Sequence, residues 1–360
     1  MKKKIKIFLG GYINSINAQN LNCLALAKHL DKSLFEVIAL EIYSGNLPQK
    51  KIDGVKTIRC FYPHRISKYI GYLYSIFLCD IAYLPKGELC GWNKFWLKLL
   101  GKKSFRTVEG IYGEEMLGQI LESGVTYDEF KNSFLGYDRV YSITRFLKEY
   151  NEKHHGIKTE EKILYLGTDT ETFLNEKKEI KALKNVIFIG RMKRRKGVFD
   201  YLELAKTFPD INFFMAGNGE DLEAIKSFIK ENGLKNVEYL GTLTHQELSK
   251  VLEKSDLHIF PSRSEGFPKV TLETAAAGVP SIVYSDYGAG EWITHEKDGF
   301  VVDTPEQIKD IVERLRKDPK ELAEVSKNAI EMAKRFDWKV VVKEWEKVIE
   351  EIINASEKTK

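Results

Sequence analysis

The alternation of short apolar runs with amphipathic helical stretches constrains the fold of this chain more than any other feature. In the second half, apolar runs that end in glycine or proline recur, and a stretch with helical spacing follows most of them. This pattern predicts βα units, which build parallel sheets covered by helices on both faces. We therefore expect an α/β fold of doubly wound parallel sheets.

The expected strands form two series. In the first half they lie at residues 4–10, 35–42, 55–61, 80–84, 104–108, 139–143 and 162–166. In the second half they lie at residues 185–190, 211–217, 237–241, 257–261, 281–285 and 299–302. Helices are expected at residues 18–30, 198–207, 220–232, 245–254, 268–277 and 305–317, and from about 321 to 353.

The length of 360 residues is too great for one ordinary core and suits two domains. The βα pattern breaks between residues 165 and 182, where a charged stretch, Asn175–Lys181, reads as a linker. We expect an N-terminal Rossmann-like domain over residues 1–170 and a C-terminal one over residues 171–337. In such sheets, ligands bind outside the carboxyl ends of the strands.

Composition indicates a folded soluble protein, with 43% hydrophobic and 30% charged residues. No apolar run reaches the length of a membrane-spanning helix, and the first apolar run meets Gly10 and Gly11 too early for a signal peptide. The four cysteines lack the paired spacing of a metal site, so free thiols are expected. These features together predict a cytoplasmic protein.

The first 150 residues are basic, with 22 lysines and arginines against 14 aspartates and glutamates. Two segments there, His64–Phe77 and Trp92–Lys103, combine basic and aromatic residues. Such helices can lie on an anionic membrane surface, and they can equally be domain helices with a basic solvated face. Nucleic-acid binding is disfavoured because no nucleic-acid motif accompanies the charge.

The stretch Ser264–Gly278 carries the strongest chemical signal. It follows an expected strand and reads as a loop with Glu265 and Gly266, then a helix with Pro268 at its first position. Glu273 lies on that helix among small residues. A carboxylate on a packed helix needs a hydrogen-bonding partner, and vicinal hydroxyls of a sugar would supply one.

A second candidate lies where the first strand of the second half ends, at Gly190–Gly197. Its Arg191 and Lys196 would suit a diphosphate, although a solvated basic loop remains the alternative. Further glycine turns end the neighbouring strands. Because these strand ends converge on one crevice, the combination is a stronger signal than each turn alone. Its members include Gly190, Gly217, Gly219, Gly241 and Thr242.

These residues together resemble the retaining glycosyltransferases of the GT-B type, the large family often numbered 4 and also called glycosyl transferases group 1. The resemblance rests on Gly190-Arg191, Lys196-Gly197, Gly217-Asn218-Gly219, Gly241, the pair Glu265 and Glu273, Gly278-Val279-Pro280, Glu291, Asp298-Gly299, Phe336-Asp337-Trp338 and the joining segment Asn151–Phe173. It covers nearly the whole chain and is dense from about residue 137. It implies two Rossmann-like domains facing a central cleft, with a last helix, about 338–360, packing back on the first domain.

The resemblance also implies roles. Arg191 and Lys196 would hold the donor's diphosphate, and Glu273 would bind the ribose hydroxyls of the nucleotide. Glu265 would face the transferred sugar, together with the backbone of Gly266, Phe267 and Pro268. Gly10 and Gly11 would approach the phosphates from the other domain. Such a site requires no catalytic metal and no cofactor, because the UDP- or GDP-sugar donor is a substrate.

One position departs from the family pattern. Many members have a histidine after the strand that here reads Ser104–Val108, and this chain has Glu109 there. That glutamate would either contact the donor sugar in place of the histidine or serve as a structural carboxylate paired with Arg106 or a lysine.

The expected function is transfer of a sugar, with retention, from a nucleotide donor to a glycan or lipid-linked acceptor of the cell envelope. Glu265, Arg191, Lys196 and Glu109 are the candidate catalytic residues. The expected location is the cytoplasm, with contact to the inner face of the membrane through the first domain. The alternatives are a nucleotide-sugar epimerase of GT-B fold and an inactive nucleotide-sugar binding protein.

Overall fold

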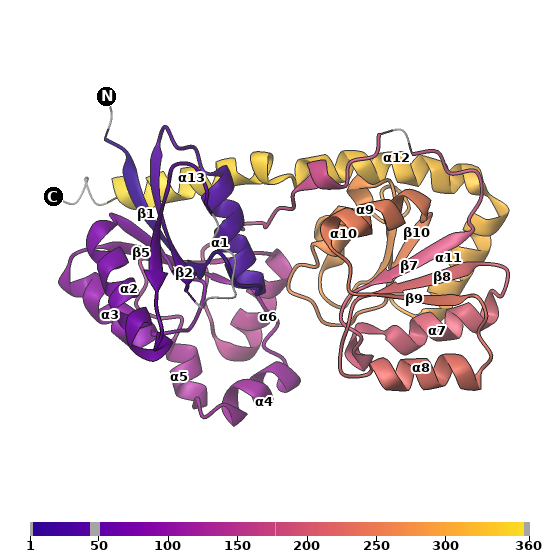
Figure 1. Ribbon diagram of the computed structural model, residues 1–360, viewed down its shortest axis with the longest axis horizontal. Coiled ribbons are helices and arrows are strands. Elements are labelled where there is room, and N and C mark those ends of the chain that lie inside the picture. Colours follow the sequence, from indigo (N-terminus) through magenta and orange to yellow (C-terminus); the bar gives the residue numbers. More distant parts are fainter. Residues whose placement is uncertain (1–2, 44–50, 177, 356–360) are drawn as a thin grey trace. The chain divides into compact units, whose positions relative to one another are not determined.

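The computed structural model describes residues 3–43, 51–176 and 178–355 (Figure 1). Lys177 of the expected linker and the last five residues of the expected final helix lie outside the described residues. The chain forms two compact units. Unit 1 holds the chain up to Leu166 together with the chain from Val341 onward, and unit 2 holds Gly167–Val340.

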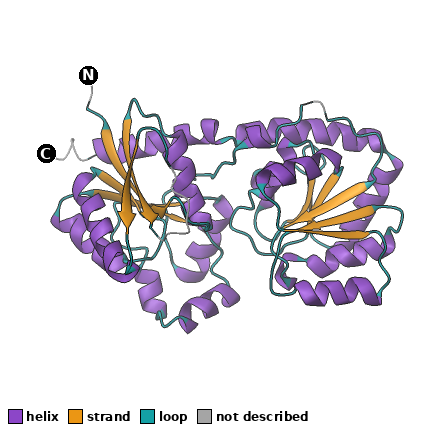
Figure 2. Ribbon diagram, in the orientation of Figure 1, coloured by secondary structure: helices purple, strands orange, loops and turns teal. Residues whose placement is uncertain are grey.

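Unit 1 is built on a parallel sheet of six strands in the order β3-β2-β1-β4-β5-β6 (Figure 2). The strands are β1 (Ile5–Tyr12), β2 (Phe35–Ile42), β3 (Val55–Cys60), β4 (Ile81–Tyr83), β5 (Lys103–Val108) and β6 (Arg139–Ser142). The order runs outward from β1 in one direction and then reverses from β4 onward. Crevices for ligands form at such reversal points, here between β1 and β4.

Several helices pack on this sheet through buried apolar residues, as α1 does with Leu26 and α2 with Ile76. The helices of unit 1 are α1 (Ala18–His29), α2 (His64–Leu78), α3 (Cys90–Leu99), α4 (Glu114–Glu122), α5 (Tyr127–Asn132) and α6 (Arg145–His155). One core cluster joins β1 and β2 to α2, with Phe8, Ile38, Tyr72 and Ile76 all buried. Asn17 and Thr144 cap α1 and α6 through hydrogen bonds from backbone N–H groups of the first turn.

Unit 2 repeats the same architecture. Its six parallel strands lie in the order β9-β8-β7-β10-β11-β12, which reverses between β7 and β10. The strands are β7 (Asn185–Ile189), β8 (Asn212–Ala216), β9 (Val237–Gly241), β10 (Leu257–Phe260), β11 (Ser281–Tyr284) and β12 (Phe300–Val302). The helices are α7 (Val198–Thr207), α8 (Leu222–Glu231), α9 (His245–Lys254), α10 (Val270–Ala276), α11 (Pro305–Lys317) and α12 (Pro319–Arg335). The expected α/β class with two doubly wound sheets is confirmed.

A last helix, α13 (Trp338–Asn354), begins in unit 2 and continues into unit 1. Its Trp345 is fully buried in unit 1, where the indole lies 5.3 Å from the ring of Tyr83 and donates a hydrogen bond to the carbonyl oxygen of Tyr165 (3.0 Å). Within unit 2, Asp337, which immediately precedes α13, accepts hydrogen bonds from the backbone N–H and the hydroxyl of Thr170.

Two local expectations are wrong. Residues 162–166 do not form a strand but make a single parallel bridge, between Ile163 and Ser142. The segment runs between β6 and α13. The carbonyl oxygen of Tyr165 accepts a hydrogen bond from the indole of Trp345 and not from a neighbouring strand. Pro268 is not the first residue of a helix, because α10 begins two residues later, after Lys269 as its N-cap.

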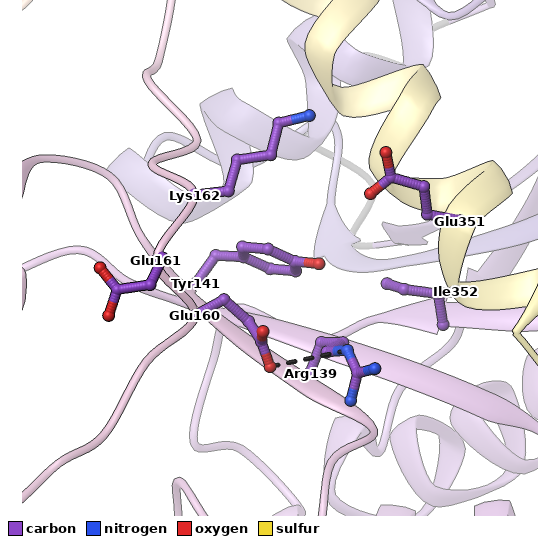
Figure 3. Close-up of a pocket in the computed structure, with 7 residues that line it drawn as sticks. All are labelled: Arg139, Tyr141, Glu160, Glu161, Lys162, Glu351 and Ile352. Carbon is purple, nitrogen blue, oxygen red and sulfur yellow. Dashed lines mark ion pairs between the residues drawn. The ribbon is translucent and has the colours of Figure 1, made fainter.

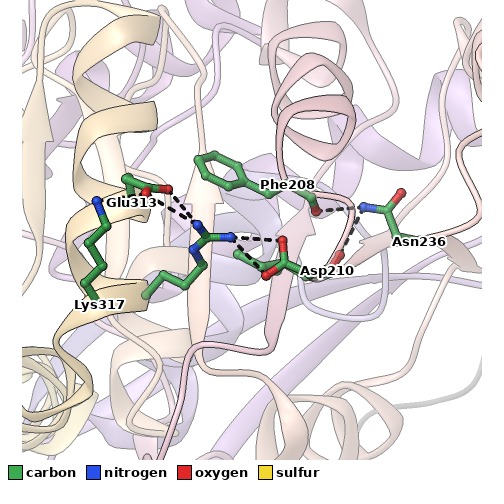
Figure 4. Close-up of polar contacts among 7 residues, drawn as sticks. Phe208, Asp210, Asn236, Glu313 and Lys317 are labelled. Carbon is green, nitrogen blue, oxygen red and sulfur yellow. Dashed lines mark hydrogen bonds and ion pairs between the residues drawn. The ribbon is translucent and has the colours of Figure 1, made fainter.

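Polar side chains hold the loops at the amino end of the second sheet (Figure 4). The amide nitrogen of Asn236 donates to three backbone carbonyl oxygens, those of Ala205, Phe208 and Ile211, at 3.0–3.1 Å. Nearby, Arg316 forms an exposed pair with Asp210 (2.9 Å). The hydrogen bonds of Asn236 satisfy carbonyl groups that are not paired within a helix or a sheet. The side chains of Arg316 and Asp210 are exposed, so water can hydrate them equally well when their ion pair is broken.

Replacing Asn236 by alanine should therefore destabilise the protein by about 1–3 kcal/mol, because several partly buried carbonyl groups lose their donor. The matched control, Arg316→Ala, should cost at most about 1 kcal/mol, as is usual for exposed ion pairs. Urea denaturation followed by circular dichroism measures both. Equal losses in the two variants would contradict this ranking.

Candidate functional site

The candidate residues of unit 2 gather where its strand order reverses. The loop after β7 carries Arg191 and Lys196, and the loop after β10 carries Glu265. Since β7 and β10 are hydrogen-bonded neighbours, the two loops leave the same edge of the sheet side by side. The sequence places them about 70 residues apart, and the topology brings them together.

Glycine at position 197 permits this close approach. Its φ of +73° lies in the left-handed region, and a Cβ there would be 2.1 Å from the carbonyl oxygen of Pro261. The backbone after β7 therefore rests directly on the backbone after β10. This contact sets the distance between Lys196, which precedes the glycine, and Ser262, which follows the proline.

Lys196 and Glu265 form an ion pair in this crevice. The Nζ of Lys196 binds Oε1 of Glu265, and the same oxygen accepts a hydrogen bond from the hydroxyl of Ser262 (2.6 Å). Both side chains of the ion pair are largely buried. Burial lowers the pKa of Lys196, and the charge of Glu265 opposes that shift.

The pair leaves binding capacity unused. An ammonium group has three donors, so Lys196 can serve a phosphate oxygen as well as Glu265. Within the described part of the chain, both contacts of the Glu265 carboxylate fall on Oε1 and no hydrogen bond reaches Oε2. The site thus offers a cationic donor and a carboxylate acceptor at one point, which suits a ligand with both phosphate and hydroxyl groups.

Arg191 lies in the same loop in a different environment. Its side chain is 69% exposed, and its guanidinium pairs with Glu220 at 3.6 Å. Glu220 also binds Lys193 (2.9 Å), and this lysine holds the pKa of Glu220 below its usual range. Arg191 is therefore a solvated cation at the rim, whereas Lys196 is a buried one.

The glycines of the neighbouring strand ends are required by packing. A Cβ at Gly217, whose φ is +134°, would lie 1.9 Å from the carbonyl oxygen of Gly190. A Cβ at Gly219 would lie 2.5 Å from the carbonyl oxygen of Met192. These turns lock the loops after β7 and β8 together, and Thr242 follows exposed at the end of β9.

The loop that leads into α10 is held by aromatic contacts. The ring of Phe267 lies 4.8 Å from that of Trp292 and 6.0 Å from that of Phe336. Trp292 donates in turn to the hydroxyl of Thr271 (3.1 Å). Pro268 is buried and Gly266 is partly buried, so this loop packs against its neighbours in unit 2.

Glu273 projects from α10 into a mostly buried position. Its Oε1 is 3.5 Å from the hydroxyl of Thr168, the limit of a hydrogen bond. Burial raises the pKa of Glu273, while His245, Lys269 and Thr168 act to lower it. A carboxylate with so weak a partner is a site that ligand hydroxyls would stabilise.

In unit 1, Gly10 and Gly11 lie inside β1, before its end at Tyr12, where the pairing with β2 shifts register. Both are buried, and a Cβ on Gly10 would lie 2.4 Å from Leu84 while one on Gly11 would lie 2.7 Å from the sulfur of Cys23. Packing within unit 1 thus accounts for both glycines. Their expected approach to a phosphate stays a prediction.

Glu109 follows β5 and is surrounded by hydrogen-bond donors. Its Oε1 accepts from the hydroxyls of Tyr83 (2.9 Å) and Thr107 (2.7 Å), and its Oε2 accepts from the amide of Asn22 (2.9 Å). Arg106 donates instead to the carbonyl oxygen of Ser133 (2.7 Å). These contacts on Glu109 come from uncharged groups, and the contact with the donor sugar stays a prediction.

Sequence reasoning missed several partners of the candidate residues, namely Ser262, Glu220, Thr168, Asn22 and Tyr83. Ser262 had a local signal, because it stands three residues before Glu265 in the same loop. Thr168 is 105 residues from Glu273 and Asn22 is 87 from Glu109, so no local pattern links them.

Among residues 3–43, 51–176 and 178–355, no group of three or more His, Cys, Asp and Glu side chains is arranged to hold a metal ion. A cavity of about 370 Å³ lies in unit 1 between β6 and α13 (Figure 3). Arg139 pairs there with Glu160 (3.6 Å), and burial together with that glutamate raises the pKa of Tyr141 to about 12. The lining mixes charges of both signs and lies at the amino end of β6, away from the edge where ligands bind such sheets.

The fold defines the class. Two parallel six-stranded sheets, each with its order reversed between two central strands, form the two Rossmann-like units of a GT-B architecture. Residues 169–332, which make up most of unit 2, match the model of the family described as Glycosyl transferases group 1.

Similar proteins agree with this class. An uncharacterized glycosyltransferase of Methanocaldococcus jannaschii is 27% identical over 225 residues, 62% of each chain. The sucrose-phosphate synthase of Thermosynechococcus elongatus has a similar structure, with a TM-score of 0.78, 15% identity, and coverage of 98% of this chain and 100% of that one. HepE of Anabaena, solved in complex with UDP-glucose, gives a TM-score of 0.75 at 14% identity, with 96% and 100% coverage. This chain spans less than two thirds of the length of the curated relatives it matches in sequence.

The raised pKa of Glu273 has a consequence for stability. A carboxyl group whose pKa is higher in the folded state favours folding when protonated, so stability falls as pH rises from the ordinary glutamate pKa to the raised one. Glu273→Gln should therefore raise the melting temperature of the ligand-free protein at neutral pH. The gain should disappear at pH values below the ordinary glutamate pKa.

Melting curves across that pH range measure the effect, with Glu253→Gln on the exposed side of α9 as the control. A lower melting temperature for Glu273→Gln at neutral pH would mean that the charged carboxylate is already stabilised without a ligand.

Proposed function

We propose that this protein is a glycosyltransferase that moves a sugar from a nucleotide-sugar donor to a glycan or lipid-linked acceptor, with retention of configuration. The observation that carries the proposal is the Lys196–Glu265 pair at the point where the strand order of unit 2 reverses, with Oε2 of the glutamate unbonded within the described part of the chain. The family match over residues 169–332 supports the same class of reaction.

In this proposal the diphosphate of the donor binds at the loop after β7. Loss of a nucleoside diphosphate from the sugar builds negative charge on the leaving oxygens, and fixed cations stabilise that charge most when it is greatest. Lys196 supplies a desolvated cation there, and Arg191 can exchange Glu220 for a phosphate oxygen because it is exposed. A cation in a water-poor site interacts more strongly than one in solution.

The carboxylates of Glu265 and Glu273 would accept hydrogen bonds from hydroxyl groups of the donor. Oε2 of Glu265 is available to a hydroxyl of the transferred sugar. Glu273, whose hydroxyl contact to Thr168 is a long 3.5 Å, would gain two short hydrogen bonds from the vicinal hydroxyls of ribose. A UDP- or GDP-sugar fits these requirements, and the likeness to a structure that contains UDP-glucose supports that class of donor.

The acceptor is proposed to be a lipid-linked or envelope glycan, used at the cytoplasmic face of a membrane. Support comes from the basic and aromatic character of unit 1. The cysteines described as free, three of them buried, suit a reducing compartment.

A bound donor should raise the melting temperature by mass action, with a stabilisation of about 2.7 kcal/mol when the ligand is at 100 times its dissociation constant. We expect this shift with at least one member of a panel of UDP-, GDP- and ADP-sugars. Lys196→Ala and Glu273→Ala should each reduce it, because they remove the phosphate and ribose contacts. Lys226→Ala, an exposed change on α8, is the control. An unchanged shift in Glu273→Ala would remove the ribose role.

Turnover should not depend on a divalent metal, because Lys196 and Arg191 are proposed to supply the positive charge for the leaving diphosphate. Release of nucleoside diphosphate from the donor that gives the largest shift can be followed with and without EDTA. We expect equal rates, and a rate restored only by added Mg²⁺ or Mn²⁺ would contradict a metal-free mechanism.

A further inference from the structure

Large apolar side chains are exposed mainly in unit 1, and many of them lie on two helices. Across the described residues, unit 2 exposes only Leu174 and Val340 among its large apolar side chains. In unit 1, Ile66 and Ile70 on α2 and Phe95 on α3 are 62%, 64% and 59% exposed. We call the following group the α2–α3 face: Ile66, Tyr69, Ile70, Trp92, Phe95 and Leu99.

The face is continuous across the two helices. On α2 its residues recur at intervals of three and four, and on α3 at positions 92, 95 and 99, so each helix presents one stripe. The stripes touch, since the rings of Tyr69 and Trp92 lie 5.3 Å apart in an edge-to-face arrangement. The opposite side of α2, with Tyr72 and Ile76, is buried against the sheet (Figure 1).

Positive charge surrounds this apolar surface. Neither α2 nor α3 contains an aspartate or glutamate, and both carry basic residues, of which Arg65 and Lys98 are exposed. At the end of α3 a hollow of about 500 Å³ is lined by four lysines, Lys94, Lys98, Lys102 and Lys103. One acidic residue, Asp138, also lines it, and it is paired with Lys103 at 2.9 Å.

We propose that the α2–α3 face docks on the surface of a bilayer that contains anionic phospholipids, with a lipid phosphate seated in the lysine-lined hollow. Apolar and aromatic side chains flanked by lysines are the arrangement that binds at the boundary between acyl chains and headgroups. Basic residues near such a surface each add attraction to anionic lipid. No helix in the described residues is long and apolar enough to cross a membrane, so the contact is interfacial.

A second copy of the chain fits this surface less well. A twofold contact would place the same face of two molecules together, and the basic residues around one face would meet those around the other. Like charges brought together in a partly dry interface repel each other strongly. An anionic surface instead neutralises them.

The biological role of this docking rests on the proposed function, because docking would bring the enzyme to a lipid-linked acceptor. Binding to vesicles needs neither donor nor acceptor. A protein that fails to bind vesicles can still show the donor-induced thermal shift, and a protein without that shift can still bind vesicles, so the two proposals fail separately.

The test is co-flotation of the full chain with vesicles of phosphatidylcholine alone and with about one third of it replaced by phosphatidylglycerol. We expect binding to the anionic vesicles only, weakened as salt screens the charges. Arg65→Glu with Lys98→Glu, and separately Ile66→Ser with Ile70→Ser and Phe95→Ser, should each reduce partitioning by at least about tenfold. All five positions are exposed, so the variants should melt at the wild-type temperature.

The matched controls are Met116→Ser with Leu121→Ser, two exposed apolar residues on the acidic helix α4, and Lys226→Glu on α8. They should bind as the wild type does. Absence of wild-type binding to anionic vesicles would overturn the proposal, and so would equal binding by the α2–α3 variants. A dimer in light scattering that the serine variants convert to a monomer would assign the face to a second copy instead.

Discussion

The ion pair between Lys196 and Glu265 is the interaction on which the candidate site depends. Bringing two charges out of water costs more than most single contacts return, so such a pair persists only where the surrounding structure fixes it. Here the fixing element is backbone packing, because Gly197 lies against the carbonyl of Pro261 and places the two side chains within reach. Ser262 then supplies a further hydrogen bond to the same oxygen.

The two cations of the loop after β7 show why burial matters for function. Arg191 is solvated and shares Glu220 with Lys193, so a ligand phosphate would replace one carboxylate partner by another anion at little net gain. Lys196 is desolvated, burial lowers its pKa, and the charge and hydrogen bond of Glu265 oppose that shift. Added negative charge at this lysine is therefore worth more than at the arginine. Of these two cations, the buried Lys196 is the one on which charge stabilisation in the proposed reaction chiefly depends.

Sequence alone predicted the alternation of strands and helices well, because apolar strands and amphipathic helices have local hydrophobic patterns. It also singled out Glu265, Glu273 and Lys196, since glycines and charged residues at strand ends are visible without a structure. It failed where partners are distant. The contact of Lys196 with Glu265 spans 69 residues, and that of Tyr83 with Glu109 spans 26. Composition showed that both His64–Phe77 and Trp92–Lys103 combine basic and aromatic residues. Only the packing shows which apolar side chains are exposed and that Tyr69 of α2 contacts Trp92 of α3.

The two units share one strand order yet differ at the reversal point. In unit 2 glycines bring backbones together, and the loops after β7 and β10 carry a buried lysine and a carboxylate whose Oε2 accepts no hydrogen bond from the residues that the structure describes. In unit 1 the corresponding edge is filled by side chains that bind one another. Tyr12 donates to Glu88 (3.3 Å), Lys68 binds the same oxygen (3.1 Å), and Lys86 lies 4.6 Å from the centre of the Tyr12 ring.

This difference matches the chemistry of the two proposed substrates. A diphosphate is small, highly charged and common to UDP-, GDP- and ADP-sugars, so backbone groups and fixed cations suit it. A glycan acceptor differs from one enzyme to another and is recognised by its pattern of hydroxyl groups. Glu88 and Lys86 lie in the loop after β4, outside the strands, so they can differ between related enzymes while the sheet is kept. The shared topology therefore provides two reversal points, and under the proposed function their different residues would suit one to a constant group and the other to a variable one.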